Sequence, residues 1–134
     1  MIASAAPGAM AQDETGIAIA RSDEGVFQAC SGGTPEAALG CARTKCRSAG
    51  GENCQRIRWC FPSGYSGAMS YLANREITRV TYLCGAPSEA ALINMLAARC
   101  VSDPSATECR LMALWSPDGS ENARTDKLGK NSAD

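Results

Sequence analysis

Residues 34–46 read TPEAALGCARTKC, and residues 88–100 read SEAALINMLAARC. Each stretch begins with a hydroxyl side chain that can cap a helix and carries a glutamate in its first turn, where the helix dipole favours an acid. Alanine and leucine recur at helical spacing between these ends, and a basic residue followed by a cysteine closes each stretch. The two stretches therefore predict two short, capped helices that end in the same way.

The similarity between the two halves extends beyond the helices. A shift of 54 residues places cysteines of one half on cysteines of the other, with one inserted residue before the last pair: Cys30 on Cys84, Cys46 on Cys100 and Cys54 on Cys109. Three such matches together with a matched helix start predict an internal duplication.

Strand-like segments surround both predicted helices. Alternating or β-branched residues separated by turn residues predict two strands before each helix and one after it. In the first half these strands are 16–21, 25–30 and 53–60, and in the second half 68–73, 77–84 and 108–115. The predicted fold is α+β: two β-β-α-β repeats forming one mostly antiparallel sheet of about six strands, with two helices on one face and disulfides as staples.

The predicted repeats cover the middle of the chain. They form a single duplicated domain over 15–116, with repeat one at about 16–60 and repeat two at about 66–116. Residues 1–14 are rich in alanine and include Ala-Met-Ala before Gln12, which is typical of a flexible leader or the remnant of a signal peptide. Residues 117–134 are polar and without periodicity, so we expect a disordered tail.

The eight cysteines indicate an oxidising compartment. They are even in number and lie within residues 30–109, whereas aromatic residues make up only 5% of the chain, so the core is thin and needs covalent support. No C-x-x-C pair and no histidine is present, which disfavours a structural zinc site. We therefore predict disulfides, no metal and no cofactor, in a protein that is secreted or periplasmic.

The duplication suggests which cysteines pair. Cys46 and Cys54 recur as Cys100 and Cys109, which predicts one bond from each helix end to its following strand. Cys41 and Cys60 have Met95 and Trp115 in the corresponding positions, which suggests that these two cysteines bond to each other. Cys30 and Cys84 would then join the two halves. The predicted disulfides are Cys46–Cys54, Cys100–Cys109, Cys41–Cys60 and Cys30–Cys84.

Several classes of function lack their usual residues. The chain has no histidine for acid–base chemistry, and its net charge of −1 disfavours general binding of nucleic acid. No apolar run reaches the 18 residues of a membrane span. The carboxylates of the predicted domain lie mostly in turns and caps, so we predict no catalytic residue, and a small carboxylate-dependent hydrolase is kept as an alternative.

One cluster of charge stands out near the end of the first helix. It comprises five basic residues within sixteen positions: Arg43, Lys45, Arg47, Arg56 and Arg58. Arg56 and Arg58 alternate with Ile57 and Trp59, which predicts that both arginines lie on the sheet face opposite the core. Such a face could bind an anionic partner such as an acidic protein, a lipid headgroup or a glycan. The alternative is a solvated helix end and sheet face.

The repeated pattern of an alanine-rich helix with a cysteine at its end, then a cysteine in a strand, resembles a bacterial exported family. This family is catalogued as domain of unknown function 4189. The similar segments, over about residues 16–116, are GIAIA at 16–20, PEAALGCARTKC at 35–46, ENCQRIRWC at 52–60, SGAMSYL at 66–72, PSEAALINMLAARC at 87–100 and ECRLMALW at 108–115. Cys30, Cys41 and Cys84 depart from the family pattern. The resemblance implies an exported α+β domain and no catalytic residue.

These observations together favour a binding function. We expect an exported, non-enzymatic protein that acts through a rigid surface as an effector, inhibitor or immunity-like module, because little entropy is lost when a preorganised surface docks. Its partner would be a protein or another envelope or host component. A structural, envelope-associated protein is a further alternative.

Overall fold

The computed structural model describes residues 14–122 and 126–129. The predicted leader therefore lies outside the described residues except for Glu14. Four elements of the first half follow in the order strand, strand, helix, strand: β1 (Gly16–Arg21), β2 (Phe27–Gly32), α2 (Pro35–Ser48) and β3 (Gln55–Cys60).

The second half has the same order of elements. It consists of β4 (Tyr65–Ala73), β5 (Ile77–Ala86), α3 (Glu89–Ser102) and β6 (Ala106–Trp115), which are followed by β7 (Glu121–Asn122) and β8 (Lys127–Gly129). The first strand is central in both halves, because the strand orders are β2-β1-β3 and β5-β4-β6. The class is α+β with antiparallel sheets, as predicted. The duplication itself stays a prediction.

The helices begin where the sequence predicted. Thr34 Oγ1 accepts a hydrogen bond from the amide of Ala37 at 3.1 Å, and Ser88 Oγ accepts one from the amide of Ala91 at 3.0 Å. Each cap satisfies an amide that the first turn of a helix leaves without a partner. The start of each helix is thus determined by residues within four positions of it.

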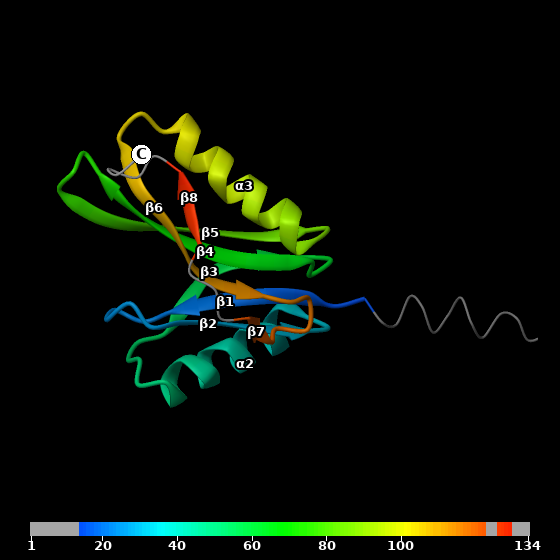
Figure 1. The fold of residues 1–134 in the computed structure, drawn as a ribbon. Helices are drawn as coiled ribbons and strands as arrows, with labels where there is room; N and C mark the ends of the chain where they lie inside the picture. The colour runs from blue at the N-terminus through cyan, green and yellow to red at the C-terminus, as the bar shows by residue number, and fades with distance from the viewer. Residues whose placement is uncertain (1–13, 123–125, 130–134) are drawn as a thin grey trace, which may run out of the picture.

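The predicted arrangement of layers, one sheet with both helices on one face, is wrong. There are two sheets, which pack against each other, and α2 and α3 cover their outer faces (Figure 1). The inner layer between the sheets contains Ile17 and Ile19 of β1 together with Tyr82 and Trp115 of the other sheet. A single sheet would leave one of its faces in water, whereas every residue from Gly16 to Ala20 is buried here.

Four disulfides staple the layers, and two of them are the predicted ones. Cys46–Cys54 and Cys100–Cys109 each join the end of a helix to the strand that follows. The predicted pairs Cys41–Cys60 and Cys30–Cys84 are wrong, because the structure has the following bonds instead: Cys30–Cys41 and Cys60–Cys84.

A β-bulge in β5 accounts for the different pairing. Cys30 pairs with Ala18 across the sheet and faces α2, so it meets Cys41 of that helix. In β5 the register shifts near Gly85, whose φ of +86° suits glycine, and Cys84 faces the inner layer. Positions that match in sequence therefore lie on opposite faces of their sheets. Cys84 then meets Cys60 at the end of β3.

The segment after Trp115 is not the disordered tail that the sequence predicted, where the structure describes it. β7 and β8 both pair with β6, and the amide of Leu111 donates to the carbonyl of Asp126 at 2.8 Å. Leu128 is buried in the apolar layer beneath α3. A single apolar residue in a polar stretch provided too little periodicity to predict this strand.

Candidate functional site

The structure separates the five basic residues that the sequence grouped. Lys45 is part of the internal framework, because its Nζ donates to the carbonyl of Ala29 at 2.6 Å and to that of Gly119 at 3.3 Å. This amine ties α2 to β2 and to the segment before β7. Lys45 is thus not available to an external partner.

Arg56 and Arg58 do not share a face, and that prediction is wrong. The register of β3 shifts so that Arg58 lies opposite Ile19 and Arg56 lies opposite Ala20, with Ile57 as the extra residue. Because neighbouring residues of β1 face opposite sides, the bulge places Arg58 toward the other sheet and Arg56 toward the α2 side. Arg58 Nε accordingly donates to the carbonyl of Tyr82 on β5 at 3.0 Å.

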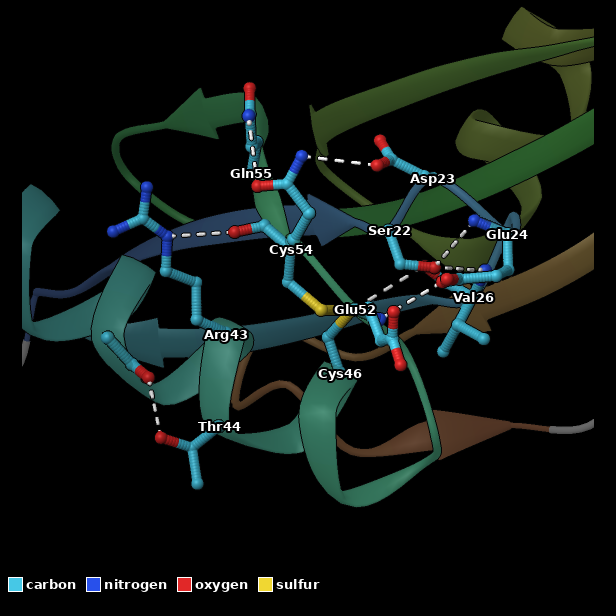
Figure 2. Close-up of a disulfide and its surroundings, with 12 residues drawn as sticks. Ser22, Asp23, Glu24, Val26, Arg43, Thr44, Cys46, Glu52, Cys54 and Gln55 are labelled. Atoms are coloured by element: carbon cyan, nitrogen blue, oxygen red, sulfur yellow. Dashed lines mark hydrogen bonds between the residues drawn. A yellow bond between two sulfur atoms is a disulfide. The ribbon is translucent and has the colours of Figure 1, made fainter.

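Three arginines remain on the α2 side of this sheet. Arg43 and Arg47 are one helical turn apart on α2, and both are exposed. Arg43 leans toward β3, since its Nε donates to the carbonyl of Cys54 at 3.1 Å beside the Cys46–Cys54 disulfide (Figure 2). This contact uses one nitrogen of the guanidinium, whose terminal nitrogens still have donors to offer. Arg56 lies farther along β3.

Two aromatic side chains extend the same side of β3. Trp59 lies opposite Ala18 in the register, so it is on the face that carries Arg56. The Trp59 and Phe61 rings are nearly parallel, with an angle of 24° between their planes and centroids 6.4 Å apart. Phe61 is 54% exposed. We name the surface formed by Arg43, Arg47, Arg56, Trp59 and Phe61 the α2–β3 face.

A glycine positions the Trp59 ring. A Cβ atom added to Gly16 would overlap Cη2 of Trp59, so the indole rests directly on the backbone of β1. Sequence reasoning missed this aromatic pair. The signal that could have found it is the segment RWCFP at 58–62, in which Trp59 and Phe61 are two residues apart and therefore on one side of a strand.

Three groups with shifted pKa values are not members of this face, although Glu24 is bonded to Glu52 two positions before Cys54, which Arg43 contacts. The pKa of Glu24 is lowered, mainly by a hydrogen bond from the backbone amide of Glu52, and the pKa of Asp118 is lowered, mainly by a hydrogen bond from the Ser120 hydroxyl. A general acid needs the opposite shift. Burial raises the pKa of the Tyr82 hydroxyl, against the positive charge of Arg21.

The described part of the chain contains neither a free cysteine nor a cluster of metal-binding side chains. All eight cysteines are in disulfides. Among residues 14–122 and 126–129, no three Cys, Asp or Glu side chains are arranged to hold a metal ion. The acidic loops near Cys54 are instead bonded internally, with Glu24 accepting from the amide of Glu52 and Asp23 accepting from Asn53 (Figure 2).

The remaining hollows of the described surface are open. One of about 410 Å³ lies at the exposed side of α3 and is lined by Leu83, Met95, Ala98, Arg99 and Ser102. Another, of about 330 Å³, lies near the start of β5 and includes Arg21 and Arg79. Neither of these two contains a carboxylate among its lining residues, whereas hollows of about 250 Å³ and 360 Å³ contain one carboxylate each, Asp23 and Asp103.

Comparisons with protein-family models, with curated proteins and with solved structures give no match to this chain. The resemblance to the family of unknown function 4189 therefore stays a prediction. Both helices of the described part are too short and too polar to cross a membrane. Four disulfides are typical of proteins that fold in an oxidising environment.

Proposed function

We propose that this chain is an exported, non-enzymatic binding protein, secreted or periplasmic, that recognises an anionic partner through the α2–β3 face. The observation that carries the proposal is the placement of Arg43 against the start of β3 and of Arg56 on the same side of β3 as Trp59, whose ring stacks with the exposed Phe61. Exposed guanidinium groups and an exposed aromatic ring on one side of the sheet combine charge with apolar contact area. Interfaces are enriched in both kinds of side chain.

The framework beneath this face supports the proposal. The Cys46–Cys54 disulfide joins α2 to the start of β3, and the Cys60–Cys84 disulfide holds the end of β3 against β5. The strand that carries Arg56 and Trp59 is thus fixed at both ends. A surface that is already ordered loses little conformational entropy on binding.

The proposal can be tested with charge-reversed variants on immobilised anionic supports. Three supports cover the main chemistries: a polyuronate, poly-glutamate and phosphatidylglycerol vesicles. We expect the wild type to be retained on at least one support at low ionic strength and to elute as salt is raised. The double variant Arg43→Glu/Arg56→Glu should lose this retention.

A matched control variant has the same net charge, but its two substitutions lie outside the α2–β3 face. Arg75→Glu/Arg79→Glu alters two exposed arginines around the β4–β5 turn and should be retained like the wild type. Equal loss of retention in the two double variants would refute the proposal, since it would reflect net charge alone. Failure of the wild type to bind any of the three supports would refute it as well.

A further inference from the structure

We infer that the partner of the α2–β3 face is an acidic polysaccharide, whose sugar rings stack on Trp59 and Phe61 while its carboxylates bind the arginines of α2 and β3. This inference rests on the proposed function and names the chemical class of its partner. The inference depends on the geometry of the aromatic pair, because binding through charge alone would need no aromatic rings.

The two rings form an apolar, stacked and offset pair. The two planes differ by 24°, and centroids 6.4 Å apart mean that the rings are offset, so part of each face is left uncovered. An aromatic face carries partial negative charge and attracts weakly positive C–H bonds. One side of a pyranose ring presents several C–H bonds in a plane, which matches this surface better than an extended peptide does.

The pair is held in place rather than free to turn. Trp59 is partly buried and rests on Gly16, which has no side chain to displace the indole. Phe61 stacks against Trp59 one position beyond the Cys60–Cys84 disulfide. The exposed Phe61 ring and the uncovered part of the indole are therefore already ordered before a sugar ring binds.

The arginines of the α2–β3 face match the charge of such a partner. Guanidinium groups bind carboxylates through paired, charge-assisted hydrogen bonds. The side chains of Arg47 and Arg56 are exposed and make no hydrogen bond or ion pair with another described residue, and Arg43 retains its terminal nitrogens. A polymer with a carboxylate on each ring could therefore place charge on α2 and β3 while its rings stack on Trp59 and Phe61.

The test measures the affinity of the full chain for a uronic acid tetramer by isothermal titration calorimetry, with Trp59 fluorescence as a second readout. A neutral glucose tetramer of the same length, poly-glutamate and phosphatidylglycerol vesicles are the comparison ligands. We expect the uronate to bind more tightly than all three. Its affinity should fall as ionic strength rises.

Two variants address the rings and leave every arginine in place. Phe61→Ala removes an exposed ring, and Gly16→Ala forces the Trp59 indole to move. Each should weaken uronate binding about tenfold, the size of one stacking contact of about 1.4 kcal/mol. Gly40→Ala is the matched control, because a Cβ there meets no atom within 4 Å, and it should bind like the wild type.

The outcomes separate this inference from the proposed function. If Phe61→Ala and Gly16→Ala bind the uronate unchanged while Arg43→Glu/Arg56→Glu does not bind, the polysaccharide inference is overturned and the anionic binding face stands. If poly-glutamate or the vesicles bind more tightly than the uronate, the polysaccharide inference is likewise overturned and the anionic binding face stands. If Arg43→Glu/Arg56→Glu binds every ligand as the wild type does, both fall. Phe61 is exposed, so its variant remains informative even if Gly16→Ala is poorly folded.

Discussion

At the scale of single residues, Tyr82 is a polar group in an apolar layer. It is 6% exposed between the two sheets, its ring meets that of Phe27 edge to face, and its hydroxyl has no hydrogen-bond partner among the described residues. Tyr82→Phe should therefore raise the free energy of unfolding at neutral pH by about 1 kcal/mol, because it removes a buried hydroxyl that folding leaves unpaired. Urea unfolding followed by circular dichroism measures this change.

The same residue predicts how stability depends on pH. Burial raises the pKa of folded Tyr82 above its ordinary value near 10, so the unfolded chain releases this proton first as pH rises. The ionisation of Tyr82 therefore leaves stability unchanged below about pH 10 and lowers it above that pH. Unfolding midpoints at a series of pH values should decline less steeply for Tyr82→Phe than for wild type. Equal slopes in the two proteins would contradict this account.

Lys45 shows that a charged residue in a basic cluster can be structural. Lys45→Met keeps the methylene chain but removes the donor to the Ala29 and Gly119 carbonyls. We expect a loss of about 2 kcal/mol in the free energy of unfolding, as for other hydrogen bonds from charged groups. Hydrogen exchange should also become faster in residues 116–122. Lys127→Met, at an exposed position, is the control, and exchange that is equally slow in both variants would contradict the assignment.

At the scale of elements, β8 completes the layer beneath α3. Leu128 is 7% exposed and belongs to the same apolar cluster as Leu92 and Leu96 of α3. Leu128→Ala should lower the free energy of unfolding by about 2 kcal/mol, near the low end for a buried leucine. Urea unfolding provides the measurement, with Lys127→Ala as the surface control. An unchanged midpoint for Leu128→Ala would mean that β8 does not contribute to the core.

The helices and strands also show which structural features could be predicted from the sequence. The helix starts at Thr34 and Ser88 were predictable because capping depends on residues within a few positions. The Cys46–Cys54 bond was predictable because the same two positions recur as Cys100 and Cys109 in the second half. The face of Cys84 was not, because it depends on one bulge at Gly85. The one-residue shift places Cys84 and Ala86 on opposite faces of β5, although they are two positions apart.

The candidate site was predictable in part for the same reason. Arg43, Arg47 and Arg56 were identified as basic residues, but the bulge in β3 separates Arg58 from them. The contribution of Gly16 depends on contact between strands β1 and β3, which are about forty residues apart in sequence, and no local pattern of residues reports such a contact.

At the scale of the whole molecule, Cys60–Cys84 is the only one of the four disulfides that joins the two halves. It links β3 to β5 across 24 positions of sequence. Cys60→Ala/Cys84→Ala should lower the free energy of unfolding by about 3 kcal/mol, through greater freedom of the unfolded chain. Urea unfolding followed by the fluorescence of buried Trp115 measures this loss, and an unaltered midpoint would contradict the role of this bond.

The central claim is that a rigid scaffold presents the α2–β3 face to an acidic polysaccharide. The most direct test is a titration of the isotopically labelled protein with a uronic acid tetramer, followed residue by residue through amide chemical shifts. The account predicts that the largest shifts fall at Arg43, Arg47, Arg56, Trp59 and Phe61 and their immediate neighbours. Shifts concentrated along α3 or around the β4–β5 turn, or no shifts at all, would contradict it.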